Sequence, residues 1–481
     1  MALRSAQEYR QSVAAQKPRL FLGGKKVEDV SSDPVMKSVV ESTAKIYELA
    51  KDPRYTDIMT VRSHLTGEII NRNLHVAGSI DDLEKRAEMA LLTSQKLGTC
   101  NYRCVGADCL NALASVTWEM DKTKGSDYHG RFNRFLTYLQ ENDLACSGAV
   151  TDAKGDRNKK MSEVDPDMYV HMSDMNDDGI FVRGAKLHQS GATVANETIV
   201  IPGGFLRPGE EKFAIAFAVA NSAPGITYIA QHNAFSAERE SCEDIYELGN
   251  PVFGQRETCM MIFEDVFIPW ERVFLCGETE YTGKLISRFA KMHRMNCGGA
   301  CKVGFADIII GASVLASEYS GTDKVPHIRE MLTEMVRHSE AAHACTIAAA
   351  VKGNEEPAGS GVFLPNDMFG NVAKITTAYG FWQIMALAGD IGGGLIVTAP
   401  SLKDLKNEET RPYVEKYLAA AESAEKRLRI SKVLQNWTAG LHGPGTWHGA
   451  GSPQAQKIAL YRAANLEEKK AIAREIAGIE D

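Results

Sequence analysis

The sequence predicts an α+β protein in which a central β-domain lies between two helical regions. Two observations carry this prediction. Apolar residues recur at helical spacing near both ends of the 481-residue chain, and short β-rich runs bounded by Gly, Pro, Asn and Asp fill the middle. A chain of this length can form two or three domains with cores of their own.

The first region, residues 1–142, is expected to be an N-terminal helical domain. Its clearest helix follows Ser79 in "SIDDLEKRAEMALLTSQKLGTC", where a Ser cap, early acidic residues and helical apolar spacing coincide. Residues 143–276 are expected to be the β-domain, because "DDGIFVRGAKLHQSG", "ETIVIPGGF", "KFAIAFAVA" and "CMMIFEDVFIP" are short runs separated by turn residues. Residues 277–481 are expected to be a C-terminal helical bundle. "IREMLTEMVRHSEAAHACTIAAAVKG" and "RPYVEKYLAAAESAEKRLRISKVLQNW" there have amphipathic periodicity.

Composition narrows the class of protein. The net charge of −8 and the absence of a Lys/Arg-rich run argue against a nucleic-acid partner. The start "MALRSAQEYRQSV" lacks the apolar core of a secretory signal. The most apolar stretch, Ile375 to Ala399, is interrupted by polar residues and glycines, which favours buried structure over a membrane span. We therefore expect a cytoplasmic protein whose ten cysteines are thiols or metal ligands rather than disulfides.

Two groups of potential metal ligands stand far apart in the chain. "TCNYRC" holds Cys100 and Cys104 at i, i+4, so that both thiols would share one helical face. "KMHRMNCGGACKVG" holds His293 with Cys297 and Cys301, four and eight residues later. Thiolates with one imidazole suit zinc or an iron–sulfur cluster. The alternative is that these cysteines are small buried hydrophobic residues, as the other six are expected to be.

Several motifs resemble one family. "KGDR" at 154–157, "VRGAKLHQSG" at 182–191, "FIPWERVFLC" at 267–276, "CKVG" at 301–304 and "HGAGSPQAQ" at 448–456 resemble the 4-hydroxybutyryl-CoA dehydratases of the 4-hydroxyphenylacetate 3-hydroxylase flavoprotein family. The resemblance implies an acyl-CoA dehydrogenase-like architecture, FAD, a [4Fe–4S] cluster and a homotetramer. Carried over by motif, it implies the cluster ligands Cys100, Cys104, His293 and Cys301.

The resemblance also implies roles for other residues. His293 and Glu257 become candidate bases, and Lys302 becomes a candidate catalytic cation that would offset cluster charge or simply be solvated. Ser190 is expected to form a hydrogen bond with the edge of the flavin ring. Lys154 and Arg157 are expected to bind the flavin phosphates. "GDIGGG" resembles a segment that reaches FAD from a neighbouring subunit. The expected cofactor-binding residues are Lys154, Arg157, His188, Gln189, Ser190, Gly392 and Gly393.

The chain departs from the dehydratase pattern in two places. There the histidine and the last cysteine are seven residues apart, with a tyrosine four after the histidine; here the separation is eight, and Cys297 stands in the tyrosine's place. This leaves open whether Cys297 or Cys301 binds the cluster. The dehydratases also have a glutamate at the position of Gly445, two residues before Trp447. A roomier pocket would suit another C4 substituent, even a cation over the Trp447 ring, or a longer or substituted acyl chain, unless Glu257 covers the lost role.

The leading hypothesis is a lyase that removes the C4 substituent of an acyl-CoA by redox-neutral radical chemistry. The β-proton is not activated by the thioester, so acid–base catalysis alone is insufficient. The simplest reaction is 4-hydroxybutyryl-CoA to crotonyl-CoA and water, with vinylacetyl-CoA isomerisation as a further activity. A flavin monooxygenase of the 4-hydroxyphenylacetate type and a non-catalytic, redox-sensing relative are the alternatives.

Overall fold

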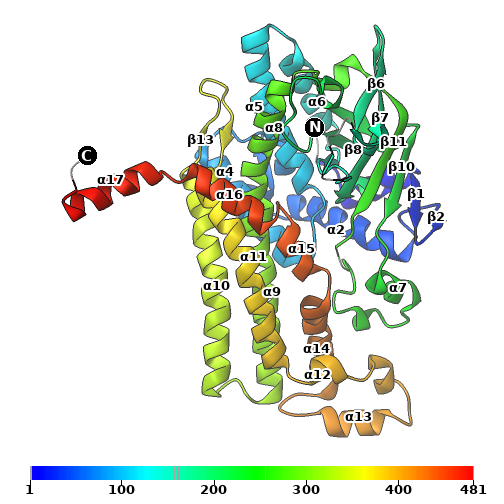
Figure 1. The fold of residues 1–481 in the computed structure, drawn as a ribbon. Helices are drawn as coiled ribbons and strands as arrows, with labels where there is room; N and C mark the ends of the chain where they lie inside the picture. The colour runs from blue at the N-terminus through cyan, green and yellow to red at the C-terminus, as the bar shows by residue number, and fades with distance from the viewer. Residues whose placement is uncertain (1–2, 157, 160–162, 255, 480–481) are drawn as a thin grey trace.

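The computed structural model describes residues 3–156, 158–159, 163–254 and 256–479. Figure 1 shows a layer of strands on one side of a tall bundle of helices, with the last helix extending away from the body. Helix and sheet are both abundant, which confirms the α+β prediction. The N-terminal helices are α1 Ala6–Ala14, α2 Pro34–Lys51, α3 Thr56–Met59, α4 Ile80–Leu97, α5 Cys104–Lys124 and α6 Tyr128–Glu141.

Two sheets form the β-domain. One has six strands in the order β2-β1-β10-β11-β7-β6, and the other has four in the order β12-β9-β8-β5. Two parallel pairings, β1 with β10 and β5 with β8, occur among otherwise antiparallel neighbours. The strands are β1 Arg19–Leu22, β2 Lys25–Val27, β5 Cys146–Ala149, β6 His171–Met175, β7 Gly179–Gln189, β8 Glu197–Val200, β9 Ile215–Ala220, β10 Ile226–Ala230, β11 Cys259–Pro269 and β12 Val273–Cys276.

The N-terminal region is less purely helical than its sequence suggests. Strands β1 and β2 come from residues expected to lie in the helical domain, yet they extend the β-domain's larger sheet. A small hairpin, β3 Thr60–Arg62 with β4 Ile69–Asn71, lies in the same region. The β-domain in turn contains one short helix, α7 Ala234–Ser241. Runs of three or four residues are too short to give a distinct periodicity, and only the tertiary pairing reveals them.

The C-terminal region is a bundle built around one long helical rod. α8 Thr279–His293 continues through a π-helix, Arg294–Ala300, into α9 Cys301–Ser320. By apolar composition the stretch Thr279–Ser320 is long enough to span a membrane, but 61% of its most apolar window is buried inside the protein, as in a core helix. The remaining elements are α10 Pro326–Val351, the hairpin β13 Asn354–Glu355 with β14 Phe363–Leu364, α11 Asp367–Gly392, α12 Leu395–Thr398, α13 Arg411–Leu418, α14 Ala424–Ala439, α15 His442–His448, α16 Pro453–Ala463 and α17 Leu466–Ala477.

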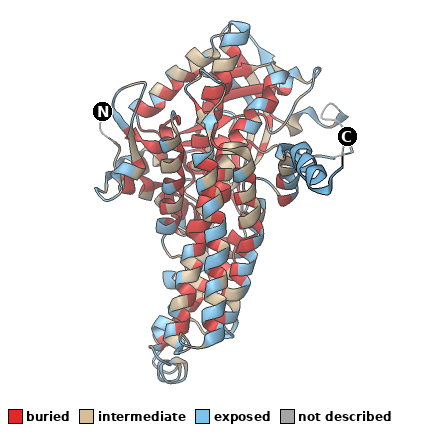
Figure 2. Cartoon of the chain, turned by 90° about the vertical axis from the view of Figure 1, so that its left-hand side faces the viewer, coloured by how far each residue is buried: buried red, intermediate tan, exposed pale blue. Residues whose placement is uncertain are grey.

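Local signals explain several helix boundaries. Ser79 caps α4 by accepting a hydrogen bond from Asp82 N, and Gly98 ends the helix at a φ of 61°. The long amphipathic stretch near residue 420 proves to be two helices, because Ser423 accepts a hydrogen bond from Lys426 N and starts α14 afresh. Buried residues concentrate along the inner faces of the bundle and between the sheets, while the last helix is exposed (Figure 2).

Candidate functional site

Five potential metal donors meet in one pocket between α4, α5, the α8–α9 rod and α15. Their helices begin or end at the pocket: Cys104 is the first residue of α5, His293 the last of α8 and Cys301 the first of α9. The Cys104 Sγ, a His293 ring nitrogen and the Cys297 Sγ all lie within 4.8 Å of one another. The residues that line the pocket are Ala90, Cys100, Asn101, Cys104, Val105, Ser190, Arg256, His293, Asn296, Cys297, Cys301, Lys302, Phe305, His442, Gly445 and Thr446.

The first two thiols are brought together by a turn and not by a helix. Cys100 precedes α5, so the expected shared helical face is wrong. The Asn101 side-chain oxygen accepts hydrogen bonds from Arg103 N at 3.0 Å and Cys104 N at 3.1 Å, which satisfies free N–H groups at the start of α5. Tyr102 has a φ of 58°, and its N–H donates to Cys100 Sγ at 3.4 Å. The backbone of the turn therefore orients both thiols.

The other three donors lie along the α8–α9 rod where it widens into a π-helix. A π-helix accommodates one more residue than an α-helix over the same rise, and such segments are frequent at functional sites. The segment Arg294–Ala300 separates His293 from Cys301. It therefore absorbs the eighth residue of their separation and keeps both side chains at the pocket. Thr377 Oγ1 donates to the Gly298 carbonyl at 2.6 Å, which fixes the widened turn against α11.

His293 is oriented by a buried carboxylate that sequence reasoning missed. Its Nδ1 lies 2.8 Å from Asp108 Oδ2, and Asp108 also accepts from Arg86 Nη2 at 2.9 Å and from Asn296 Nδ2 at 2.9 Å. Asp108 has no exposed surface. Burial opposes protonation of His293, but the neighbouring Cys297 and Asp108 outweigh it and raise the pKa of His293 to about 10. A carboxylate behind an imidazole is typical of a metal-ligating histidine and equally of a positioned base. Asp108 stands one helical turn after Cys104, which is the signal that could have found it.

Two cations face the thiols. Lys302 Nζ lies 3.6 Å from Cys297 Sγ and 3.7 Å from Cys301 Sγ, and the residue is only 5% exposed, so the expectation of a solvated lysine is wrong. Arg256 was not predicted as a site residue. Its guanidinium donates to Ser190 Oγ and to the Gly445 carbonyl, each at 3.4 Å. Nearby thiolates raise the pKa of Lys302 against the opposing effect of burial.

Glu257 lies on the other side of Arg256. It is 3% exposed, and its backbone N–H donates to the Tyr102 hydroxyl at 3.1 Å. Burial, together with Cys100, raises the pKa of Glu257 to about 8. Thr193 approaches closely enough to offset part of this rise, but neither carboxylate oxygen is in hydrogen-bond geometry with a described residue. Glu257 lines a neighbouring pocket that shares Arg256 with the donor pocket. It is a buried carboxyl group adjacent to, but not among, the thiols.

The expected flavin residues separate into different places. Lys154 lines a cavity of about 270 Å³ in the β-domain, together with Asp152, Tyr169 and Lys186. His188 is exposed and has a φ of 62°. Ser190 is buried in the donor pocket, beside Arg256. Arg157 lies outside the described residues.

The remaining flavin candidates have structural contacts. The Gln189 side-chain amide accepts a hydrogen bond from Val150 N at 3.2 Å and donates to the carbonyls of Thr151 and Leu187. Its hydrogen-bonding groups are therefore used by the backbone of this chain. At the end of α11, a Cβ on Gly392 would overlap the Ile396 side chain, and Gly393 adopts a φ of 60° as the C-cap. Within this chain these two glycines serve the turn into α12.

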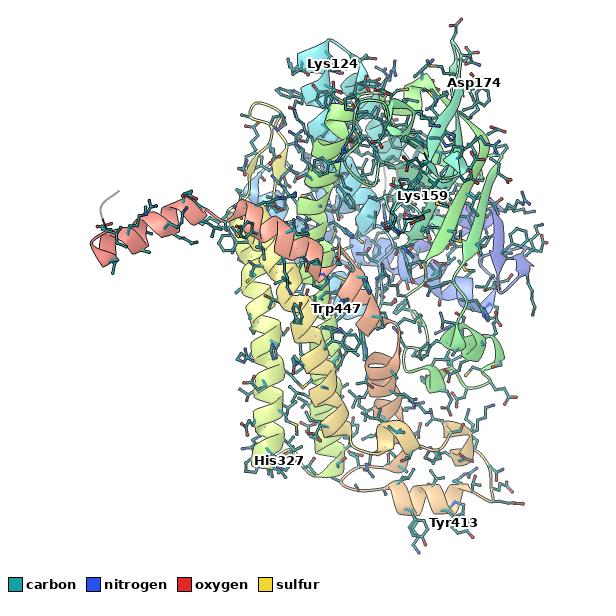
Figure 3. The ribbon with its side chains drawn as sticks, viewed as in Figure 1. Lys124, Lys159, Asp174, His327, Tyr413 and Trp447 are labelled. Atoms are coloured by element: carbon teal, nitrogen blue, oxygen red, sulfur yellow. The ribbon has the colours of Figure 1, made fainter. Side chains whose placement is uncertain are left out.

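The wall opposite the thiols is formed by α15. A Cβ on Gly445 would lie 3.0 Å from Arg256 Nη1, so the guanidinium occupies the space beside this glycine. Trp447, labelled in Figure 3, is not among the described residues that line the pocket; its ring packs edge-on against Tyr379 of α11, 5.0 Å between centroids. His442 faces the pocket as a further residue that the sequence did not indicate. It stacks on Trp437 at 4.4 Å, and burial lowers its pKa to about 3.

Comparison with known proteins identifies the family. Residues 5–275 match the 4-hydroxyphenylacetate 3-hydroxylase N-terminal description and residues 282–478 the C-terminal one. The chain is 39% identical to 4-hydroxybutyryl-CoA dehydratase/vinylacetyl-CoA-Δ-isomerase of Clostridium aminobutyricum, over 99% of this chain and 100% of that protein.

Solved structures agree. An oxygen-tolerant archaeal 4-hydroxybutyryl-CoA dehydratase from N. maritimus has a TM-score of 0.96 and 36% identity, covering 100% of this chain and 96% of that one. The oxygenase component of 4-hydroxyphenylacetate 3-monooxygenase complexed with FAD has a TM-score of 0.86, and the superposition covers 98% of this chain and 98% of that one. At 24% identity this similarity supports the fold alone. The resemblance to the dehydratases is thereby confirmed, and the chain belongs to the 4-hydroxyphenylacetate 3-hydroxylase family.

Proposed function

We propose that this protein is an FAD- and [4Fe–4S]-dependent lyase that eliminates the C4 substituent of an acyl-CoA. The simplest reaction is conversion of 4-hydroxybutyryl-CoA to crotonyl-CoA and water, with vinylacetyl-CoA isomerisation as a second activity. The observation that carries the proposal is the meeting of Cys100, Cys104, His293 and Cys301 in one pocket, from segments nearly two hundred residues apart. The relatives named above support the same reaction.

The donors fit an iron–sulfur cluster. Thiolates are the usual cluster ligands, and one imidazole can replace a thiolate. The pocket supplies both kinds of donor, and Lys302 and Arg256 offset negative charge on the sulfurs. With Cys100, Cys104, His293 and Cys301 as the ligand set that the family resemblance implies, a bound cluster would supply Lewis acidity, and FAD would supply one-electron chemistry.

The residues of this chain would orient the substrate and move its protons. A substrate group bound at the thiols would face Arg256, Ser190 and the Gly445 carbonyl, whose hydrogen bonds define one wall. His293, held on Asp108, would lie on the other wall as one candidate base. Glu257 is the second candidate, because a carboxyl group with a pKa near 8 can both take up and release a proton near neutral pH. Burial of the pocket excludes water from the reacting carbon atoms.

A plain hydroxyl is the C4 substituent that this pocket favours over a cation. Arg256 and Lys302 would repel an ammonium group, and Trp447 lies outside the lining. The cation-over-Trp447 hypothesis therefore has no support in the described geometry. Measuring 4-hydroxybutyryl-CoA against its 4-amino analogue tests this point. We expect the hydroxyl substrate to be preferred, and Gly445→Glu, which would pair with Arg256, to reduce that preference; preference for the amine would contradict the assignment.

The architecture and assembly belong to the same proposal. We infer the acyl-CoA dehydrogenase arrangement from the order of helices, β-domain and helices. We infer a homotetramer, in which Gly392 and Gly393 would approach the flavin of a neighbouring subunit. Exposed apolar residues on α17, such as Ile472 and Ile476 at 55% and 85%, support an assembly larger than one chain. Light scattering of the purified protein tests the tetramer.

The decisive experiment is anaerobic purification followed by measurement of iron, labile sulfide, FAD and crotonyl-CoA formation. We expect iron and sulfide in equal amounts, FAD, and turnover of 4-hydroxybutyryl-CoA. The flavin monooxygenase alternative, favoured by the family match, predicts instead hydroxylation of 4-hydroxyphenylacetate with reduced flavin and oxygen, and no iron. A protein with the cluster but no turnover of any 4-substituted acyl-CoA would be the redox-sensing relative.

A further inference from the structure

The donor pocket contains one sulfur more than the family ligand set uses. Cys100, Cys104, Cys297 and Cys301 all line it together with His293, which makes five donors for a cluster of four irons. Cys297 is the most central of them. Its Sγ lies within 4.8 Å of both the Cys104 Sγ and a His293 nitrogen, whereas the corresponding atom of Cys301 lies outside this group.

The position of Cys297 is fixed by packing around the π-helix. The residue is 9% exposed. A Cβ on the following Gly298 would lie 3.1 Å from the Lys374 side chain, and one on Gly299 would overlap the Thr346 hydroxyl. The two glycines therefore let α10 and α11 pack closely against the segment that carries Cys297.

The surroundings of Cys297 are those of a ligand thiolate and not of an apolar core residue. A buried cysteine that merely fills space has hydrocarbon neighbours. Cys297 instead faces the Lys302 ammonium group at 3.6 Å, essentially the distance of 3.7 Å at which Lys302 faces Cys301. One cation thus serves both sulfurs equally, and N–H donors to ligand sulfurs are a recurrent feature of cluster sites.

Charge balance is compatible with a four-thiolate cluster. A cluster in its usual oxidised form carries two negative charges with four thiolates, and one with three thiolates and an imidazole. The pocket presents two guanidinium or ammonium groups to the sulfurs, Arg256 and Lys302. These two cations balance a four-thiolate cluster when the Asp108 carboxylate is paired with a protonated His293. They also balance a cluster bound by His293 together with the Asp108 carboxylate.

We infer that Cys297 is a cluster ligand in this protein, which completes a four-thiolate set with Cys100, Cys104 and Cys301, and that His293 remains on Asp108 as an unligated imidazole. This inference rests on the proposed function for the presence of the cluster. It changes the fourth ligand and, with it, removes the exchangeable iron through which a histidine-bound cluster would supply Lewis acidity. Ligation exchanges one iron–nitrogen bond for one iron–sulfur bond, and the Cys297 thiol gives up its proton as iron binds. His293 then serves the substrate and not the metal.

Pulsed EPR of the dithionite-reduced, anaerobically purified protein tests the ligand set, because an imidazole bound to iron gives a strong ¹⁴N coupling. We expect no such coupling in the wild type and a full iron content in His293→Ala. In Cys297→Ala we expect either a new ¹⁴N coupling, as His293 takes the vacant position, or loss of about one iron in four. Cys109→Ala changes a fully buried cysteine of α5 that does not line the donor pocket; it is the matched control and should change neither quantity.

The opposite pattern would overturn the inference: a ¹⁴N coupling in the wild type that disappears in His293→Ala, with iron content unchanged in Cys297→Ala. Full iron in Cys301→Ala with loss in Cys297→Ala would show that Cys297 replaces Cys301 and not His293. Absence of iron from the wild type would instead reject the cluster and the proposed function with it. FAD content and circular dichroism identify any variant that fails to fold.

Discussion

The two segments that supply the donors are held in place by different means. The turn around Cys100 and Cys104 is fixed by its own hydrogen bonds, from Asn101 and from the Tyr102 N–H. The π-helix between His293 and Cys301 is fixed by what packs against it, Lys374, Thr346 and the Thr377 hydroxyl. A self-contained turn offers two thiols and little freedom, whereas a segment shaped by its neighbours can take an inserted residue and an additional thiol. We therefore expect variation in the site to concentrate in the π-helix.

Loss of a thiol from the turn should have the largest effect. Cys104 is within 4.8 Å of both Cys297 and His293, and its loss removes one of the two thiols that the turn supplies. We expect Cys104→Ala to lose its iron and to reduce turnover at least about 100-fold, while part of the FAD remains bound. Iron analysis, flavin absorbance and the acyl-CoA assay measure the three quantities. If Cys104→Ala retains its iron, the thiols of the turn are not required for iron binding, and the comparison between the turn and the π-helix fails.

Packing against the π-helix should come next. A methyl group on Gly299 would overlap Thr346, whereas one on Gly298 would meet the more flexible Lys374 chain at 3.1 Å. We expect Gly299→Ala to destabilise the protein by about 1–3 kcal/mol and Gly298→Ala by less. Chemical denaturation of both variants gives the comparison. Equal and negligible effects would mean that α10 and α11 do not shape the segment.

The turn can be weakened without removing a sulfur. Asn101→Ala deletes the side-chain oxygen that accepts from Arg103 N and Cys104 N. We expect a loss of about 1 kcal/mol, the usual value for a helix cap, and faster loss of iron to a chelator. Asn142→Ala, which removes an exposed side chain at the end of α6, is a control. If the rate of iron loss to the chelator is unchanged in Asn101→Ala, the hydrogen bonds of Asn101 are not needed to retain iron, and this prediction is wrong.

A pH-dependent effect is expected at Glu257, which the turn contacts through Tyr102. Its pKa is about 8 in the folded protein against an ordinary 4.5. Between these values the folded state holds a proton that the unfolded state has lost, so stability falls as pH rises, by up to about 1.4 kcal/mol per unit. We expect the melting temperature to fall less in Glu257→Gln than in the wild type from roughly pH 5.5 to 7.5. The exposed Glu264→Gln should follow the wild type.

Sequence reasoning succeeded where a signal was long or chemically distinctive. The strands β7 and β11 and the capped helix α4 have clear periodicity, and cysteine with histidine in two clusters indicated a metal site. It missed one local signal: the Asn101 side chain accepts a hydrogen bond from Cys104 N, which places Cys100 in a turn before α5. Elsewhere it failed where the cause was tertiary, because β1 is a strand only through its pairing with β10. Arg256 belongs to the β-domain and lines the pocket, and no local sequence pattern predicts this contact.

The parallel pairing of β1 with β10 bears on how the chain folds during synthesis. Arg19 aligns with Thr227, so β1 must wait until some two hundred further residues have left the ribosome. At roughly 5–20 residues per second, that wait is on the order of ten to forty seconds. During this interval Leu20 and Leu22, later buried, and an unpaired strand edge are available to other nascent chains. The segment that contains β1 is thus secured only after β10 has been made, and a chaperone that holds it during this interval would raise the yield.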